Sequence, residues 1–157
     1  MRWYTADFDA LSWHDVSVHG LRIVEGAHGV AELQLDIDFI LEWVDAGHGG
    51  VRFRVAQAML QFHEVSGLRL ALDYVACSAG TTPFSIDAIR REPLRPPADG
   101  AGEAGADGAN DYGPWRWRIE VNWPEGFLDF EASGFSQWLV GDPRDQDAPS
   151  LASSERL

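Results

Sequence analysis

Residues 33–39 alternate apolar and polar side chains without interruption, in the order Leu-Gln-Leu-Asp-Ile-Asp-Phe. A period of two residues is typical of a β-strand that buries one face and exposes the other. Residues 51–55, Val-Arg-Phe-Arg-Val, alternate in the same way but carry arginines where the first segment carries aspartates. The two segments are therefore predicted to be neighbouring antiparallel strands whose outer faces carry opposite charge.

Further strand patterns follow along the chain, separated by turns that contain glycine or proline. They cover residues 16–24, with a β-bulge at Gly20, 30–39 with an extension to 44, 51–62, 68–74, 84–89, 115–123, 127–132 and 135–140. Residues 3–14 are expected to be an irregular lead-in with about one helical turn. Without a convincing amphipathic helix, this pattern predicts an all-β fold. We expect a single antiparallel sandwich or an open, curled barrel of seven to eight strands.

The 157 residues are most simply one domain, which we assign to residues 1–141. Residues 93–114 are rich in glycine, alanine and aspartate, with no large apolar side chain between 98 and 111. Such a segment buries too little surface to offset its ordering entropy, so a mobile loop is predicted. Residues 142–157 are polar and are predicted to be a flexible tail.

The formal net charge is −13, and all 12 basic residues are arginine. The acidic residues are spread along the chain, which disfavours nucleic acid and anionic membranes as partners and fits a basic protein. The single cysteine, Cys77, cannot form an internal disulfide, and we expect it to be unreactive. The first residues do not resemble a signal peptide and no apolar run reaches about 20 residues, so a cytoplasmic protein is expected. The sequence does not indicate the oligomeric state.

Carboxylates recur along the predicted strand at 30–39 and its extension, at Glu32, Asp36, Asp38, Glu42 and Asp45. Carboxylates two residues apart share a strand face and suit a hard cation such as calcium or magnesium. We favour an ordinary solvated face that Arg52 and Arg54 balance across the ladder. Asp36, Asp38 and Glu42 are therefore predicted to form an acidic surface that binds a basic partner.

Tryptophans mark two different environments. Trp115, Trp117 and Trp123 share the phase of an apolar strand face, which indicates core packing rather than a binding platform. Trp43 follows Glu42 directly, and we predict it to be the aromatic anchor of the acidic surface.

Histidines next to carboxylates suggest a second class of function. His14 and Asp15 are adjacent, His19 lies four residues beyond Asp15, and His63 precedes Glu64. These groups suit a metal site or acid–base chemistry, but neighbouring residues of a strand point to opposite faces. We therefore favour His14 and Asp15 as a cap at one end of the sheet, where they contribute to binding. His63 is then a histidine at a strand end.

No cofactor is expected. The chain contains no phosphate-binding glycine loop, nucleophile elbow, Cys-x-x-Cys or His-Glu-x-x-His motif. Enzymatic activity stays open only through an alternative function. That alternative is a metal-dependent hydrolase or small-ligand-binding protein built on His14, Asp15, His19 and His63.

Several segments together resemble a family of small uncharacterised bacterial proteins. They are Trp-His-Asp at 13–15, Leu-Asp-Ile-Asp-Phe-Ile-Leu-Glu-Trp-Val at 35–44, Phe-Arg-Val-Ala at 53–56, Phe-His at 62–63, Ile-Asp-Ala-Ile-Arg-Arg-Glu at 86–92 and Gly-Phe-Ser-Gln at 134–137. The likeness covers most of residues 11–140 except the loop at 93–114, and it implies no assigned activity. The layout is also similar to that of immunity proteins of polymorphic toxin systems, which implies toxin neutralisation by binding. We therefore predict a non-enzymatic protein-binding module with an acidic surface.

Overall fold

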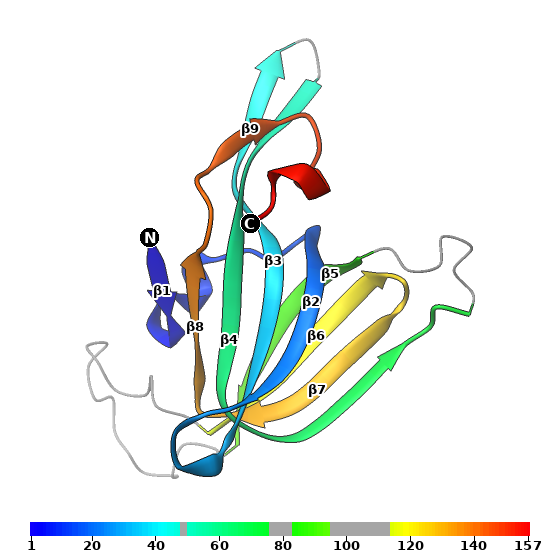
Figure 1. Cartoon of the computed structure of the whole chain (residues 1–157). Helices are drawn as coiled ribbons and strands as arrows, with labels where there is room; N and C mark the ends of the chain where they lie inside the picture. The colour runs from blue at the N-terminus through cyan, green and yellow to red at the C-terminus, as the bar shows by residue number, and fades with distance from the viewer. Residues whose placement is uncertain (48–49, 76–82, 95–113) are drawn as a thin grey trace, which may run out of the picture.

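The computed structural model describes residues 1–47, 50–75, 83–94 and 114–157. Within these residues the fold is all-β, with nine antiparallel strands in one sheet (Figure 1). Its elements are β1 Arg2–Tyr4, η1 Thr5–Ala10, β2 Val16–Glu25, η2 Ala27–Gly29, β3 Ala31–Gly47, β4 Gly50–Leu72, β5 Phe84–Pro93, β6 Trp115–Trp123, β7 Gly126–Ala132, β8 Gly134–Leu139, β9 Arg144–Gln146 and η3 Ser153–Glu155. No helix in the described part of the chain is long and apolar enough to cross a membrane.

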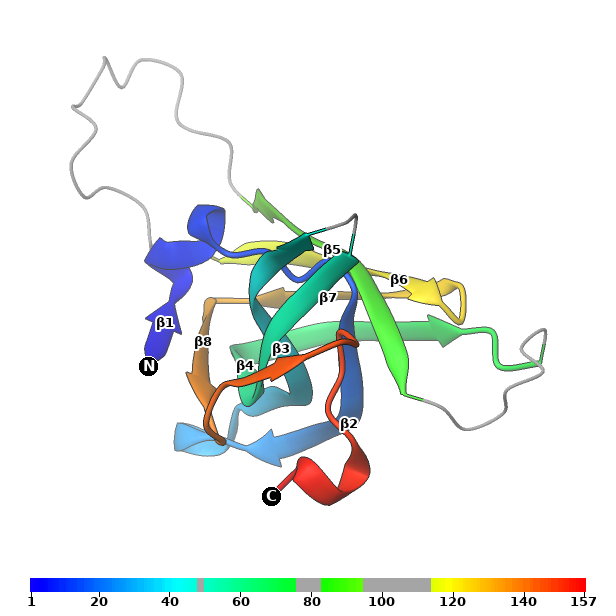
Figure 2. The same cartoon turned by 90° about the horizontal axis from the view of Figure 1, so that it is seen from above.

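The sheet curls so that the last strand in its order pairs with a strand near its middle. Its order is β1-β8-β4-β3-β2-β5-β6-β7, and β7 also pairs with β4. This pairing closes a ring of hydrogen bonds through six strands, although the ring is not a regular barrel (Figure 2). The predicted all-β fold is confirmed, in the form of a curled sheet rather than two separate sheets.

The alternating segments supply the core inside the ring. Leu33, Leu35 and Ile37 of β3 are fully buried, as the period of two predicts. Aromatic side chains from opposite parts of the ring meet there. The ring of Phe62 on β4 lies 5.1 Å from that of Trp117 on β6. Burial of these large side chains is the main source of stability for a fold of this kind.

Strand β4 differs from the prediction, which divided it into two strands joined by a turn at Ser66 and Gly67. The structure shows one strand that bends, leaves β8 after the pair His63–Gly134, and pairs with β7 from Ser66–Glu131 onward (Figure 1). Positive φ angles at Glu64 (56°) and Gly67 (63°) accompany the bend. A glycine therefore marks a change of partner here, not a reversal of direction.

Other predicted elements are confirmed. The bulge lies between Val18 and Gly20, β3 runs on to Gly47, and β6 has the predicted bounds of 115–123. Among the side chains of β6, Trp117 is fully buried but Trp123 is 51% exposed. Trp123 lies beyond a register shift between β5 and β6. Its place in the apolar alternation of β6 therefore does not bring its side chain into the core.

The prediction of a flexible tail at 142–157 is wrong for the described structure. Residues 144–146 form β9 against β4, and Leu151 is buried at 6% exposure. The polar composition of residues 142–157 does not indicate these contacts, because the partner residues lie about a hundred positions earlier in the chain. Most of the predicted loop at 93–114, and Cys77, fall outside the described residues.

Candidate functional site

The predicted acidic face of β3 is not a free surface. Asp38 has no exposed area, and the side chain of Asp36 is 30% exposed. Residues 151–157, which we call the C-terminal clasp, lie against both carboxylates. The Arg156 guanidinium bonds to Asp36 and Asp38, and the Leu151 amide donates to Asp38 Oδ2 at 2.9 Å. The chain itself therefore occupies the site predicted for a basic partner.

The predicted balance across the ladder by Arg52 and Arg54 is confirmed for Glu42, which lies opposite Arg54, but it is wrong for Asp36 and Asp38. Arg54 lies opposite Glu42 and Arg52 opposite Val44, several residues along β3 from Asp36 and Asp38. The positions across from those aspartates are Met59 and Gln57. Equal alternation in two segments indicates that they are strands, but it does not fix the register between them.

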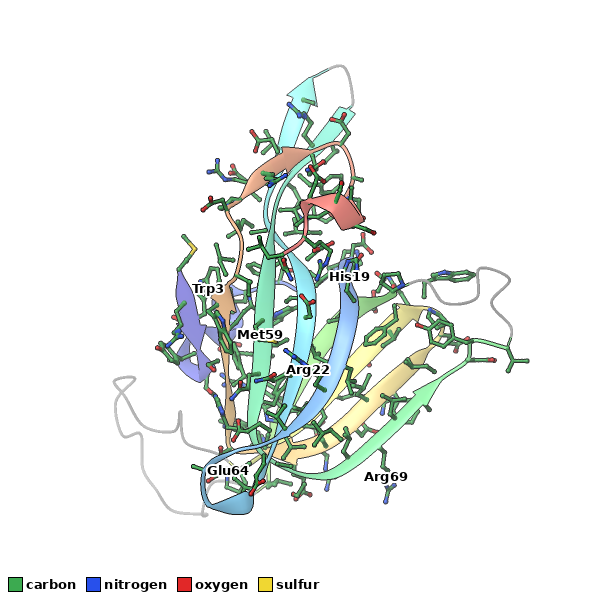
Figure 3. All side chains as sticks on the ribbon, in the orientation of Figure 1. Trp3, His19, Arg22, Met59, Glu64 and Arg69 are labelled. Carbon is green, nitrogen blue, oxygen red and sulfur yellow. The ribbon has the colours of Figure 1, made fainter. Side chains whose placement is uncertain are left out.

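His19 completes the buried polar group beneath the clasp. Its Nε2 atom lies 2.8 Å from Asp38 Oδ2, and its side chain is 21% exposed. The bulge between Val18 and Gly20 places it at this end of β2, on the side where the C-terminal segment lies (Figure 3). Gln57 adds two more bonds, donating to Asp36 at 3.1 Å and accepting from the Leu157 amide at 2.8 Å. These contacts give Asp36 and Asp38 a role in closing the fold.

His63 pairs with Glu32 rather than with its neighbour Glu64. Its Nδ1 atom lies 2.6 Å from Glu32 Oε2, and its Nε2 atom lies 3.0 Å from the Ser136 hydroxyl. A histidine between a carboxylate and a serine is the order found in nucleophilic relays. Ser136, however, lies within β8 between Tyr4 of β1 and Gln61 of β4. Where a strand has neighbours on both sides, its backbone N–H groups donate to the hydrogen bonds of the sheet. Strand β8 therefore offers no free pair of N–H groups to stabilise an oxyanion.

His14 and Asp15 lie where the chain enters β2, at one end of the sheet. His14 Nδ1 is 3.2 Å from the Asp87 carbonyl oxygen, and Asp15 accepts a bond from the Asn122 amide at 3.1 Å. Asp15 has a φ of 61°, a conformation that aspartate tolerates better than most residues. His14 and Asp15 thus tie the start of β2 to β5 and β6, in line with a cap.

The four residues of the alternative function do not form one site, although His14 Nε2 lies 3.6 Å from Asp15 Oδ2. His14 contacts Asp87, His19 contacts Asp38, and His63 contacts Glu32. In the part of the chain that the structure describes, no group of three or more histidine, cysteine or acidic side chains is placed to hold a metal ion.

Glu42 and Trp43 have a different environment, on a hairpin that projects from the ring (Figure 1). We call residues 41–47 of β3 and 50–54 of β4 the arm. Trp43 is 50% exposed and Val51 48% exposed. The Trp43 and Phe53 rings pack edge to face, with centroids 4.9 Å apart, so the indole is held in place although half of it meets solvent.

One face of the arm continues the core outward. Trp43 lies opposite Phe53 and Asp45 opposite Val51, so all four side chains share a face. Along β4 this face changes from Val55, which is fully buried, through Phe53, which is partly buried, to Val51 at the exposed end. We call Trp43, Val51 and Phe53 the apolar face of the arm. The predicted surface includes Trp43 but neither Val51 nor Phe53, although the alternation of residues 51–55 places those two side chains on one side.

The opposite face of the arm carries charges. Glu42 lies across from Arg54, and Arg52 bonds to Asp147 at 3.0 Å. Strand β9 pairs with β4 from Phe53 to Val55 and braces the base of the arm. The arm is therefore a supported element with Glu42, Arg52 and Arg54 on one face and a second face that is apolar except for Asp45.

A hollow of about 460 Å³ on the outer side of β4 to β7 is a weaker candidate. Its arginines pair with acids across the strands, as in Arg118–Asp129 at 2.8 Å and Arg116–Glu131 at 3.5 Å. Arg69 lies at its border and points away from β4 (Figure 3). Charges that neutralise one another in this way are typical of an ordinary solvated ladder.

Comparison of the chain with protein-family models, curated proteins and solved structures finds no significant match. The resemblance to a bacterial family and to immunity proteins therefore stays a prediction.

Proposed function

We propose that the protein is a non-enzymatic binding module and that the arm holds a basic protein partner. The observation that carries this proposal is the exposure of Trp43 and Val51 on a face that continues the hydrophobic core. Large apolar side chains grouped on a projecting element are typical of interaction sites rather than of inert surface. The proposal keeps Glu42 and Trp43 from the predicted surface and replaces Asp36 and Asp38 by the apolar face of the arm.

The arm is arranged for binding before a partner arrives. Phe53 fixes the Trp43 ring, and β9 supports β4 beneath it. A side chain that is already ordered loses little conformational entropy on association. Tryptophan is among the residues that contribute most to binding when a partner covers them.

Charge selects the class of partner. Exposed acids lie on the arm and on the segment that braces it: Glu42 and Asp45 on the arm, Asp145 on β9, and Asp147, which pairs with Arg52. The whole chain carries −13, so its field attracts basic proteins and repels acidic ones. A basic toxin is one partner of this kind, and its neutralisation is the version of the proposal that fits the immunity-like layout.

The experiment compares capture of proteins from the native lysate by two tryptophan variants. Trp43→Ala removes the anchor, and Trp123→Ala serves as a matched control because Trp123 is equally exposed, 51% against 50%, but lies outside the arm. We expect wild type and Trp123→Ala to capture the same basic protein and Trp43→Ala to lose it. Equal capture by both variants would refute the arm as the binding surface.

A further inference from the structure

We propose that the partner binds as an added β-strand on the free edge of β3 in the arm, through a segment with the order basic–apolar–apolar–basic. This inference rests on the proposed function, since it specifies how the arm takes its partner. It follows from the pairing of β3, from the positions of Glu42 and Asp45, and from the net charge of the chain.

The first step is that β3 loses one neighbour where the arm begins. Strand β2 pairs with β3 only as far as Ser17–Asp38, and its start at Val16 pairs with β5 instead. Beyond Asp38, β3 has a strand partner only on the β4 side, as far as the described residues go. The outer edge of β4 is covered by β9 from Phe53 to Val55. Among the described residues, the β4 edge of the arm is thus covered at its base, at Phe53 and Arg54, whereas the β3 edge has no strand partner.

An open edge presents backbone N–H and C=O groups that a further strand can pair with. Residues 42–47 of β3 are all exposed. Four consecutive pairs from Glu42–Arg54 to Asp45–Val51 keep an even register, between irregularities after Ile40 and after Asp45. The regular part of the edge therefore matches a short extended segment and offers no long template for aggregation.

Glu42 and Asp45 at the ends of this stretch determine which strand can bind. A residue directly opposite a carboxylate on a neighbouring strand is favourable when basic and unfavourable when acidic. Trp43 and Val44 lie between them, 50% and 37% exposed, and favour apolar side chains opposite. Basic–apolar–apolar–basic fits this edge in either strand direction, because the order is the same read backwards.

A second copy of this chain is a poor occupant of the same edge. In the two-fold antiparallel register that places Trp43 opposite Val44, Glu42 of each copy faces Asp45 of the other. Each copy also brings a net charge of −13. The acids thus oppose self-association while they admit a basic strand.

The test uses the blocked peptide Thr-Arg-Val-Val-Arg-Thr and the full chain, with backbone amides followed by NMR. We expect saturable shifts and slower hydrogen exchange at residues 42–46. A peptide with glutamates in place of both arginines, or with both valines N-methylated, should bind more than about ten-fold more weakly because it lacks the charges or the backbone donors.

Three results would overturn the inference: no binding of the arginine peptide at millimolar concentration, equal binding of the N-methylated peptide, or shifts that map away from the arm. Dimerisation of the chain through residues 42–46 would also overturn it, in favour of self-pairing. The proposed function fails separately, through equal capture by Trp43→Ala and Trp123→Ala. A partner held by Trp43 without protection of the edge amides leaves the proposed function intact and removes only the added strand.

Discussion

At the scale of single residues, the contacts of Arg156 differ most from what its sequence position indicates. Its guanidinium lies among Asp36 and Asp38, and the two side chains of the Arg156–Asp38 pair are 10% and 0% exposed. Nothing in the local sequence around residue 156 points to a partner more than a hundred positions earlier. Alternation along a strand indicates on which face of the sheet a side chain lies. The contact of Arg156 depends instead on where the C-terminal segment packs in the folded chain.

Arg156→Met should destabilise the protein because it leaves the buried Asp38 carboxylate without its cation. Removing one partner of a buried pair typically costs about 3–5 kcal/mol. We expect the lower end, about 3 kcal/mol in urea denaturation, because opening of the terminal clasp lets water reach Asp38. Arg144→Met is the matched control. Arg144 pairs with Glu155 on the surface at 50% exposure, so its loss should cost less than about 1 kcal/mol.

Restoring charge balance gives a sharper check of the same contact. The double variant Asp38→Asn/Arg156→Met should be more stable than Arg156→Met alone, since the neutral amide no longer leaves a buried charge unpaired. Identical stability of the single and double variants would show that Asp38 gains nothing from Arg156.

Glu64 carries backbone strain that glycine should relieve. Its φ is 56°, in the left-handed region, and its side chain is exposed at the bend of β4 (Figure 3). The left-handed conformation costs a residue with a Cβ about 1–2 kcal/mol, part of which glycine loses again through its freer unfolded chain. Glu64→Gly should therefore raise the free energy of unfolding by about 0.5–1 kcal/mol. A clear loss of stability in thermal or urea unfolding would mean that Glu64 makes a favourable contact at the bend.

At the scale of elements, the sequence predicted where strands lie more reliably than which strands pair with each other. Strand β6 and the bulge of β2 follow directly from apolar phase and from Gly20. Strand β4 was divided at Ser66–Gly67 because a glycine bend and a glycine turn look alike in a sequence. The polarity of residues 142–157 predicts a flexible tail, yet β9 pairs with β4 and Leu151 is buried at 6% exposure.

The candidate site was only partly predicted, because a local pattern identifies a strand but not the distant elements that cover it. Trp43 and Glu42 could be found because they sit in the extension of an alternating strand. That Asp36 and Asp38 are covered could not be foreseen, because the covering residues belong to the clasp. The exposure of the arm depends on where β2 leaves β3, after Ser17–Asp38, and this is a property of topology.

The clasp should open in acid. The pKa of Glu155 is lowered from its ordinary value of 4.5, first by the hydrogen bond from the Ala152 amide, then by the Gln146 side chain and Arg144. A lowered pKa means that the carboxylate stabilises the clasp above its ordinary pKa, and that this contribution is lost as the pH falls through the lowered value. The protection factor of the Ala152 amide, its exchange rate relative to an unfolded amide at the same pH, should therefore fall as the pH drops through the lowered pKa of Glu155, and Glu155→Gln should remove this pH dependence. The same pH dependence in Glu155→Gln would assign it to another group.

At the scale of the whole molecule, the ring and the net charge have separate roles. The ring of six strands is the base from which the arm projects (Figures 1 and 2). The apolar face of the arm continues the core outward. The net charge of −13 does not determine the fold, and in the proposed function it favours the approach of basic proteins.

The affinity for the captured partner should therefore depend on salt concentration mainly through the association rate. Long-range attraction is screened over about 10 Å at 0.1 M salt, so the association rate should fall on the order of ten-fold between low and high salt. Dissociation should change much less, because it is set by the apolar contacts of the arm. An association rate that does not respond to salt would show that the charge of the chain has no part in recognition.

The most direct test of the account is the dissociation constant of the purified partner for wild type, Trp43→Ala and Trp123→Ala. If the apolar face of the arm is the binding surface, Trp43→Ala should weaken binding by about 30-fold or more, which corresponds to at least about 2 kcal/mol. Trp123→Ala, with a similar exposed fraction but on β6 and outside the arm, should change it less than about three-fold. Equal dissociation constants for the two variants would contradict the central claim.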